Sequence, residues 1–534
     1  MSVPFFLTLA TVLAFNVGET FGVKRPHIIL IVADDLGWND VSFHGSPQIP
    51  TPNIDALARD GIILNNYYIQ PICTPSRSAL MTGVHPIHTG MQGHVIIGPE
   101  PYGLPLHFKL LPEHLEKLGY RRHMVGKWHL GFFKKEYTPL FRGFESHFGY
   151  WCGHQDYYDH TSEESIYWGY DMRENMSVAW DAFGKYSTEL YTDHALKLIN
   201  NHNTDEPFFL YLPHLAVHSA NSYSPLQAPE KYTSRFPWIK DENRRTFAGM
   251  MSALDDGVGE VVKALRDKGM LQDSIILFTS DNGGPAAGFD MNHASNWPLR
   301  GVKATLWEGG VRGAGFIWSP FLSKASRISQ QLMKIEDWLP TLYAAAGGDV
   351  KDLGTIDGIN MWKTLSNDLP SPQKEILHNI YPGGHTFAIR SGDFKLVNGT
   401  TYGKAWNGWY GPSGRGHSHT TVLKQIKNSD VAKSLLSINR TTWSKEKSLK
   451  SASISCGPVP KKQNCFAWKG SCLFNIKNDP CEYYNLADKY PDIVKKLMER
   501  IIEYQKTAVP SGKKPSDPDA NPTLHGGAWV SWKD

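Results

Sequence analysis

The stretch HIILIVADDLG, residues 27–37, indicates the fold class of this chain. Residues 27–33 form a mainly apolar run rich in β-branched side chains, which is typical of a strand buried on both faces of a parallel sheet. The run ends directly in Asp34 and Asp35. Two adjacent carboxylates at the end of a buried strand repel each other and are costly to desolvate unless a cation or several donors compensate. A solvated loop pair or a helix cap is the alternative interpretation.

Further apolar segments alternate with predicted helices along the first half of the chain. Strands are predicted at 62–68, 121–125, 207–212 and 274–279, and helices at 53–59, 112–118, 190–199 and 247–266. This alternation predicts an α/β fold, with a mostly parallel sheet covered by helices on both faces. Ligands of such sheets bind at the carboxyl ends of the strands.

Polar residues follow the predicted strands at five separate places. They are Asp34, Asp35, Cys73, Lys127, His129, His218, Asp281 and Asn282. Because the ends of parallel strands meet at one edge, we expect these side chains to converge. A single histidine or lysine is more often structural, but five strand ends that deliver polar groups to one edge favour a functional site.

The pentapeptide CTPSR, residues 73–77, combines a cysteine with a predicted helix start. Pro75 suits the first turn of a helix, which would run through Met81 and stop at Gly83. Cys73 would then lie at a helix N-terminus, where free N–H groups favour an anion, and Arg77 adds a positive charge. A buried or disulfide-bonded cysteine before a capped helix is the alternative.

The acidic and amide residues at the strand ends are hard oxygen ligands without the spacing typical of zinc sites. Asp34, Asp35, Asp281 and Asn282 suit Ca²⁺ or Mg²⁺, and their number favours Ca²⁺. The basic residues expected around this cation are Arg77, Lys127, His129, His218 and Lys303, the last from the glycine-rich region 296–313. Such a site could hold a tetrahedral anion and move protons.

Composition places the chain among ordinary globular proteins. The 534 residues are 41% hydrophobic and 20% charged, and the formal charge of +3 gives no support to a nucleic-acid or polybasic membrane role. The apolar run at residues 4–15 predicts a secretory signal over 1–22, and no other segment is long and apolar enough to cross a membrane. Glycosylation acceptors occur at Asn175, Asn398 and Asn439.

The composition of the sequence and the pattern of predicted elements change after residue 375. A hairpin over 388–397, a strand at 472–476 and a helix at 492–504 predict a smaller α+β domain with an antiparallel sheet. We expect long loops over 402–465 and a surface tail over 509–534. The predicted organisation is a signal peptide (1–22), a catalytic domain (23–375) and a C-terminal domain (376–534).

The six cysteines are unevenly distributed along the chain. Cys456, Cys465, Cys472 and Cys481 cluster near the C-terminus, so we expect two disulfides among them, with the pairing left open. Cys152 has no partner if Cys73 is chemically modified.

Residues 71–83, PICTPSRSALMTG, resemble the first signature of the sulfatase family, and residues 119–129 resemble the second. The chain is most similar to the arylsulfatase B group, whose pattern is echoed at 296–313, 337–342 and 377–379. This resemblance implies an alkaline-phosphatase-like fold. The segment Ser219–Ser224 is longer than that group's pattern, which leaves the leaving-group specificity open.

The resemblance also implies a modified nucleophile. Cys73 would be oxidised in the endoplasmic reticulum by the formylglycine-generating enzyme to Cα-formylglycine, and the aldehyde would hydrate to a geminal diol. The implied Ca²⁺ ligands are Asp34, Asp35, residue 73, Asp281 and Asn282. One diol oxygen would attack sulfur, with Asp281 as proton acceptor.

The remaining roles implied by the family concern the leaving group and the release of sulfate. His218 would protonate the departing alcohol, and Lys303 would bind the sulfate and the bridging oxygen. His129 would deprotonate the second hydroxyl, which expels sulfate and restores the aldehyde. Arg77 and Lys127 would hold the oxygens of residue 73.

The expected function is therefore sulfate-ester hydrolysis in the secretory pathway, by a lysosomal or secreted protein. The expected substrate is N-acetylgalactosamine-4-sulfate of glycosaminoglycans, or an aryl or small-metabolite sulfate such as a plant glucosinolate. A phosphodiester or phosphonate hydrolase and a non-catalytic sulfated-glycan binding protein are the alternatives. A homodimer is compatible with the sequence.

Overall fold

The computed structural model describes residues 25–416, 419–441 and 452–534, so the predicted signal peptide lies outside it. The strands of its large sheet are β1 (His27–Ala33), β2 (Ile62–Leu64), β4 (Arg121–Lys127), β5 (Ser146–Tyr150), β8 (Arg173–Glu174), β9 (Ser177–Val178), β10 (Phe208–Pro213), β11 (Ser274–Ser280), β12 (Gly315–Trp318) and β13 (Arg327–Ser329). Within the described residues they pair in the order β13-β2-β12-β11-β1-β10-β4-β5-β8-β9.

The centre of this sheet is parallel. Strand β1 pairs with β10 and β11, and β4 pairs with β10 and β5, all in parallel register. Antiparallel pairs occur toward the edges, where β12 pairs with β11 and β2, and β8 pairs with β5 and β9. The predicted mixed, mostly parallel α/β sheet is therefore confirmed.

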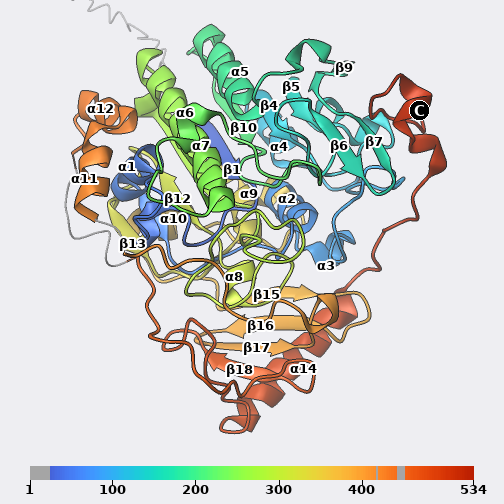
Figure 1. Cartoon of the computed structure of the whole chain (residues 1–534), viewed down its shortest axis with the longest axis vertical. Helices are drawn as coiled ribbons and strands as arrows, with labels where there is room; N and C mark the ends of the chain where they lie inside the picture. The colour runs from blue at the N-terminus through green and yellow to red at the C-terminus, as the bar shows by residue number, and fades with distance from the viewer. Residues whose placement is uncertain (1–24, 417–418, 442–451) are drawn as a thin grey trace, which may run out of the picture.

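Helices cover both faces of the sheet (Figure 1). The α-helices described up to residue 367 are α1 (Pro52–Asp60), α2 (Cys73–Thr82), α3 (Pro86–Thr89), α4 (Leu111–Glu116), α5 (Ser187–Asn201), α6 (Glu230–Thr233), α7 (Glu242–Asp267), α8 (Glu308–Val311), α9 (Trp338–Ala345) and α10 (Trp362–Asn367). Successive residues of β1 point to opposite faces. Ile29 and Ile31 share a buried cluster with side chains of α5 and α7, whereas Leu30 and Val32 pack with side chains of α2 and α9. Both layers bury apolar side chains, which stabilises the sheet.

A second, antiparallel sheet lies below the large one in Figure 1. Its strands are β15 (Glu375–Ile380), β16 (Phe387–Ser391), β17 (Phe394–Asn398) and β18 (Cys472–Asn475), and α14 (Pro491–Thr507) packs against it. The predicted 388–397 hairpin is confirmed as β16 and β17. The domain boundaries themselves stay a prediction.

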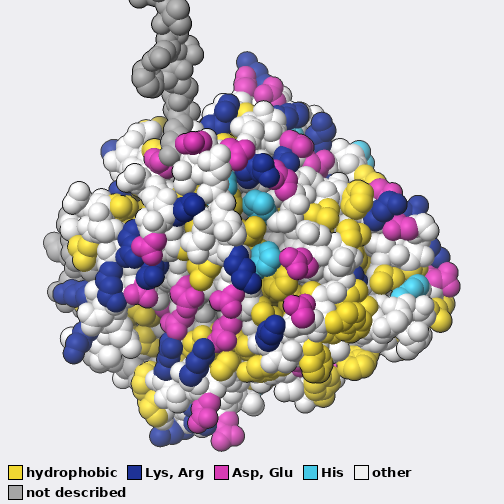
Figure 2. Space-filling model, turned by 90° about the horizontal axis from the view of Figure 1, so that it is seen from above, with side chains coloured by type: hydrophobic (Ala, Val, Ile, Leu, Met, Phe, Trp, Pro, Cys, Tyr) yellow, Lys and Arg dark blue, Asp and Glu magenta, His cyan; other side chains and the backbone are white. Residues whose placement is uncertain are grey.

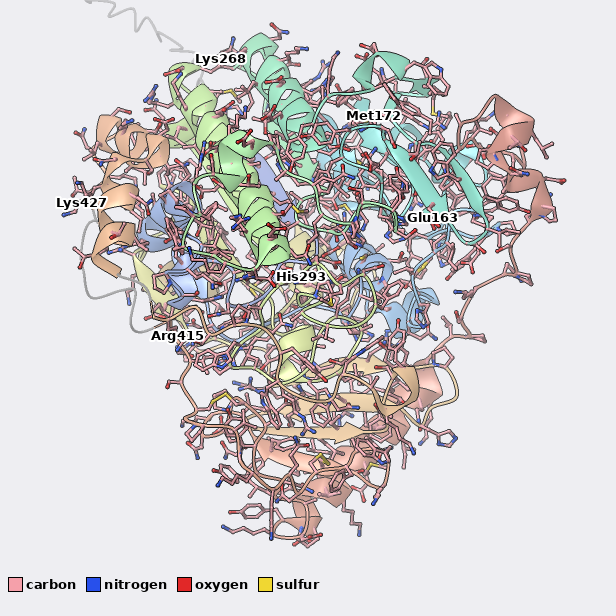
Figure 3. All side chains as sticks on the ribbon, in the orientation of Figure 1. Glu163, Met172, Lys268, His293, Arg415 and Lys427 are labelled. Atoms are coloured by element: carbon pink, nitrogen blue, oxygen red, sulfur yellow. A yellow bond between two sulfur atoms is a disulfide. The ribbon has the colours of Figure 1, made fainter. Side chains whose placement is uncertain are left out.

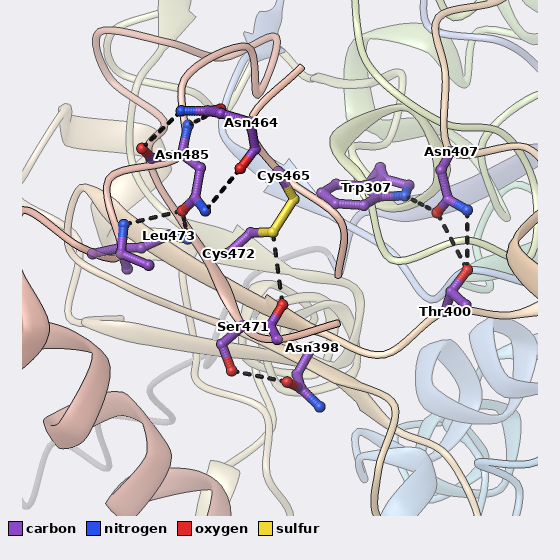
Figure 4. Close-up of a disulfide and its surroundings, with 12 residues drawn as sticks. Trp307, Asn398, Thr400, Asn407, Asn464, Cys465, Ser471, Cys472, Leu473 and Asn485 are labelled. Atoms are coloured by element: carbon purple, nitrogen blue, oxygen red, sulfur yellow. Dashed lines mark hydrogen bonds between the residues drawn. A yellow bond between two sulfur atoms is a disulfide. The ribbon is translucent and has the colours of Figure 1, made fainter. Parts of the chain in front are cut away.

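Two disulfides connect the cysteine cluster, as expected. They join Cys456 to Cys481 and Cys465 to Cys472. Figure 4 shows the second bridge beside Ser471, whose Oγ donates to Asn398 Oδ1 (2.8 Å). Cys73 and Cys152 are both buried and form no disulfide.

A fully buried ion cluster joins the small sheet to α8. Lys395 Nζ on β17 lies 2.9 Å from Glu308 Oε1 and 3.0 Å from Glu482 Oε1. The N–H of Glu308 also donates to Glu482 Oε2 (2.8 Å), and the hydroxyl of Tyr68 donates to Glu308 Oε2 (2.8 Å). Charges this deep are stabilising only when each is paired.

Two expectations about local structure are wrong. The region 402–465 is not only loops, since it contains α11 (His419–Asn428) and α12 (Asp430–Ser437), which pack on α1 and α7. In the sequence, polar residues separate the few apolar side chains that these helices bury. The buried side chains are Val422, Ile426, Val431, Ala432 and Leu435. The predicted strand 62–68 is two strands, because β3 (Tyr67–Tyr68) leaves the large sheet to pair with β14 (Met333–Lys334).

The C-terminal tail, residues 509–534, is partly buried rather than lying only on the surface. It runs from α14 to the hairpin of β6 (Thr161–Glu164) and β7 (Tyr167–Tyr170), as Figure 1 shows. There the side chain of Trp529 is fully buried, and its Nε1 donates to Ser162 O (3.1 Å). Across the described ranges, no helix is both long and apolar enough to span a bilayer.

Candidate active site

The two acidic strand ends meet because their strands are neighbours. β1 and β11 are parallel and in register from His27 to Ala33, where Ala33 lies opposite Ser280. Asp34 and Asp35 follow β1 directly, and Asp281 and Asn282 follow β11. All four side chains are buried. The N–H of Asp35 donates to Asp281 Oδ1 (3.2 Å), and Asn282 Nδ2 donates to Asp35 Oδ1 (2.6 Å). The predicted convergence of these four residues is therefore observed.

Cys73 is the first residue of α2 and lies directly beside this group. Ile72 before it is extended, and Gly83 ends the helix with φ at 67°, a left-handed conformation that glycine adopts easily. The Cys73 Sγ is buried, 3.8 Å from Asp34 Oδ1. Burial raises the pKa of the Cys73 thiol, so the unmodified side chain is not an activated thiolate.

Two buried cations hold the carboxylates. Arg77 donates from Nη2 and Nε to Asp281 Oδ2 at 2.8 and 3.1 Å, and Lys127 Nζ lies 2.6 Å from Asp34 Oδ2. Burial alone would raise the pKa of Asp34, but the charges of Lys127, His218 and Arg77 hold it well below its ordinary value. Burial and the charge of Asp34 raise the pKa of Asp281 to about 6. Asp281 is thus the carboxylate of this group best suited to accept a proton near neutral pH.

His218 and Lys303 form the opposite side of the group. Lys303 Nζ donates to Asp35 Oδ2 and to Asp290 Oδ2, each at 2.8 Å, and lies 3.1 Å from His218 Nε2. Burial and Lys303 oppose the protonated form of His218, yet the nearby carboxylates raise its pKa well above the ordinary value. His218 can therefore be protonated. Its Nε2 faces the same space as the Lys303 ammonium.

His129 is set up differently, as a neutral imidazole. Its Nε2–H donates to Ile96 O (2.9 Å), which places the unprotonated nitrogen at Nδ1. Nδ1 is buried and has no hydrogen-bond partner among the described residues. Burial and the charges of Lys127 and Arg77 hold the pKa of His129 well below its usual range. His129 can therefore accept a proton.

Three residues of the site were not predicted from the sequence. Asp290 binds Lys303, Asn292 Nδ2 donates to Val217 O (2.7 Å) and Asp35 O (3.2 Å), and the His154 ring stacks 5.9 Å from that of His218. All three lie in irregular segments rather than directly after a strand. The loop between Asn282 and Lys303 was the available signal for Asp290 and Asn292, and no signal marked His154.

The oxygen-rich group fits a divalent cation. Ligand atoms of Asp34, Asp35, Cys73 and His218 all lie within 4.8 Å of one another. Asn282 Oδ1 is buried and accepts no hydrogen bond from any described residue, which leaves it available as a ligand. Carboxylate and amide oxygens are the donors that Ca²⁺ prefers.

A cavity of about 660 Å³ leads to this group from solvent. Cys73, His129 and His218 reach its inner end, and Asp290 and Phe289 line its wall. All the residues predicted as catalytic or metal-binding thus lie in one cluster, and the cavity gives a substrate access to it.

Comparisons with known proteins agree with this geometry. The Sulfatase family model matches residues 26–348. Arylsulfatase J of Mus musculus is 41% identical over 519 residues, which cover 96% of this chain and 81% of the relative. N-acetylgalactosamine-6-sulfatase of Homo sapiens is 32% identical over 374 residues, 66% of this chain and 67% of the relative. The solved structure of Ps i-CgsB has a TM-score of 0.70 at 26% identity, and the match covers 92% of this chain and 94% of the other.

Proposed function

The chain belongs to the sulfatase family and is a sulfuric ester hydrolase, and from this premise we propose its nucleophile, cofactor and substrate class. We infer that residue 73 acts as Cα-formylglycine, formed from Cys73 by the formylglycine-generating enzyme. The observation that carries this proposal is the position of Cys73, at a helix N-terminus and 3.8 Å from a buried carboxylate oxygen. A thiol with a raised pKa is a poor nucleophile there, whereas a hydrated aldehyde supplies two hydroxyls.

The proposed cofactor is one Ca²⁺ per chain. Asp34, Asp35, Asp281, Asn282 and residue 73 would hold it, and it would supply positive charge that favours an ionised nucleophile and a bound sulfate. The buried Asn282 Oδ1 without a hydrogen-bond donor supports this assignment.

The residues around the cation provide the proton transfers of the proposed reaction. Asp281 accepts the proton of the attacking hydroxyl, which forms an O–S bond to the sulfate. As the bond from sulfur to the leaving oxygen breaks, His218 donates its Nε2 proton to that oxygen, and Lys303 neutralises the sulfate beside it. The 3.1 Å separation of Lys303 Nζ and His218 Nε2 places both groups near one oxygen atom.

Release of sulfate follows from the second hydroxyl. His129 Nδ1 removes its proton, the bond from carbon to the sulfate oxygen breaks, and the aldehyde forms again and rehydrates. Arg77 and Lys127 keep the oxygens of residue 73 oriented. The low pKa of His129 and the raised pKa of His218 support this division between base and acid.

The proposed substrate is N-acetylgalactosamine-4-sulfate in a glycosaminoglycan, or an aryl or small-metabolite sulfate such as a glucosinolate. Sulfated sugars are supported by the human relative, which is an N-acetylgalactosamine-6-sulfatase, and by the solved complex of Ps i-CgsB with k-i-k-neocarrahexaose, 25% identical to this chain with a TM-score of 0.70. The assignment to the arylsulfatase B group and a homodimeric state remain predictions.

We also propose a secretory route that ends in the lysosome or outside the cell. Two disulfides are typical of oxidising compartments. The glycosylation acceptors Asn175 and Asn439 are exposed, whereas the Asn398 amide is engaged with His385 O (2.7 Å) and Ser471 Oγ (2.8 Å). We expect glycans at the first two positions before the third.

Mass spectrometry of the peptide that contains residue 73 tests the proposed nucleophile. Formylglycine in protein from a eukaryotic host is the expected result. An unmodified thiol throughout an active preparation would contradict the proposal, and an unmodified, inactive preparation would favour a glycan-binding protein. Matched sulfate and phosphate esters test the chemistry, because preferential cleavage of the phosphate diesters would indicate a phosphodiesterase instead.

A further inference from the structure

A second groove lies directly beside the cavity of the active site. It has a volume of about 270 Å³, and Glu163, Ser165 and Ser222 line both spaces. Its outer wall includes Ile166, Trp168 and Tyr223. We propose that this groove is an outer subsite, which binds an uncharged, hydroxyl-rich sugar residue of the glycan whose sulfate is hydrolysed. The inference rests on the proposed function and narrows it. The substrate would be an oligosaccharide whose sulfated sugar has a neutral neighbour, and a glycosaminoglycan with a uronic acid at that position would fit less well.

The aromatic side chains of the groove face solvent. Trp168 is 56% exposed, Tyr223 is 57% exposed and Ile166 is 85% exposed. Large apolar side chains that gather at one exposed place commonly mark a binding surface. A sugar ring presents an apolar C–H face and a polar edge, which match an aromatic ring beside hydrogen-bonding groups. Figure 2 shows hydrophobic side chains gathered in the right half of the face seen from above.

Hydrogen bonds hold the groove in shape. Glu163, which Figure 3 labels near the turn of the β6–β7 hairpin, lies opposite Trp168 in the strand register. Its N–H donates to Asn221 Oδ1 (2.9 Å), and its Oε2 accepts from Ser222 Oγ (2.7 Å). The Tyr223 hydroxyl donates to Asp159 Oδ2 (2.6 Å). Because the Glu163 and Tyr223 side chains are already held by these bonds, a ligand pays little to order them.

The lengthened segment Ser219–Ser224 thus has a structural role. It connects the inner end of the active site, at His218, to the outer groove, at Tyr223. A substrate anchored by its sulfate near Lys303 would therefore continue along this segment toward Trp168. This continuity favours the substrate's own next sugar over a separate protein partner as the occupant.

Charge indicates which sugar fits. Glu163 is the charged side chain among the described residues that line the groove, and none of them is Lys or Arg. A second sulfate or a uronic acid carboxylate would meet the Glu163 carboxylate without a compensating cation. A neutral sugar instead offers hydroxyl donors to Glu163 and acceptors to Ser165 and Ser222. The subsite therefore selects an uncharged residue next to the sulfated one.

The direct test compares two substrates and two variants. The substrates are an aryl monosulfate and a trisaccharide with a single 4-sulfate on its terminal N-acetylgalactosamine and two uncharged sugars. We expect Trp168→Ala to lower kcat/KM for the trisaccharide by about tenfold and for the aryl sulfate by less than about twofold. Phe183→Ala is the matched control, because Phe183 is 64% exposed and does not line the groove.

A trisaccharide with a sulfate on its second sugar as well tests the charge argument. Wild-type protein should cleave it less efficiently than the monosulfated one, and Glu163→Gln should narrow that difference. Equal effects of Trp168→Ala on both monosulfated substrates, or no effect on either, would overturn the subsite.

Binding separates this inference from the proposed function. Titration of the wild-type protein with the unsulfated trisaccharide should change tryptophan fluorescence, and Trp168→Ala should abolish the change. Binding without turnover of any sulfate ester would refute the proposed chemistry and support the groove. Turnover of the monosulfated trisaccharide with unchanged kinetics in Trp168→Ala would refute the groove alone.

Discussion

Replacing Lys395 by methionine should destabilise the protein, because the buried carboxylates of Glu308 and Glu482 then lose their shared cation. The Lys395 ammonium is fully buried and contacts Glu308 and Glu482 at 2.9 and 3.0 Å. Glu308 keeps the Tyr68 hydroxyl and Arg312 as partners. Glu482 Oε1, however, has no hydrogen-bond donor among the described residues other than this ion pair. Loss of the cation therefore leaves an uncompensated buried carboxylate.

The expected cost at pH 8 is about 3–5 kcal/mol, the range for breaking one partner of a buried pair. Burial and the charge of Glu308 already raise the pKa of Glu482 to about 7, from an ordinary value of 4.5. The folded state binds the proton of the Glu482 carboxyl more tightly than the unfolded chain does. The contribution of this group to the free energy of unfolding therefore falls as pH rises from about 4.5 to 7. The Lys395→Met protein should therefore lose less stability at pH 5 than at pH 8.

Thermal unfolding at the two pH values measures this effect. Lys433→Met is the matched control, since Lys433 pairs with Asp430 at 3.0 Å on the surface, where the two side chains are 60% and 49% exposed. That pair should contribute about 0–1 kcal/mol. Adding Glu482→Gln to Lys395→Met should recover most of the loss at pH 8. A melting temperature no lower than that of Lys433→Met, or no recovery in the double variant, would refute the reasoning.

Four further outcomes are expected. Cys73→Ser should accumulate a sulfated serine, visible by mass spectrometry, and rapid steady turnover by this variant would contradict the proposed release step. His218→Ala should slow hydrolysis of sugar sulfates by about 100-fold or more, with a smaller loss for nitrophenyl sulfates, whose leaving group needs no proton; equal losses would refute its role as the acid. Treatment with a chelator should abolish activity, and Ca²⁺ should restore it better than Mg²⁺ in the same assay. Burial raises the pKa of Glu336 from 4.5 to about 7, so Glu336→Gln should raise the melting temperature more at pH 8 than at pH 5, and an equal change at both pH values would contradict this.

The parts of the fold that could be predicted from the sequence depend on local patterns. Helices cover both faces of β1, so the side chains on both sides of this strand must be mainly apolar. The resulting apolar run at residues 27–33 can be recognised from the sequence alone. Pro75 and Gly83 similarly mark α2 through backbone preferences of single residues. The site residues after the strands could be found for the same reason, since a strand end is a local feature.

Features that depend on distant contacts could not be predicted in this way. Asp290 contacts Lys303 from a loop that Asn292 holds in place by donating to Val217 O and Asp35 O, which lie far away in the sequence. No periodic pattern marks that loop. The helices α11 and α12 were missed because polar residues separate their few buried side chains, and the apolar surface that they cover belongs to α1 and α7.

The position of Trp529 has a consequence for the order of folding during synthesis. Its indole packs under the β6–β7 hairpin, and its hydrogen-bond acceptor Ser162 lies 367 residues earlier in the chain. Chains emerge from the ribosome N-terminus first, at roughly 5–20 residues per second, so the hairpin waits tens of seconds for this partner. During that interval the apolar pocket under the hairpin is open to water or to chaperones. We therefore expect this wall to be completed late, after the strands of the large sheet have been synthesised.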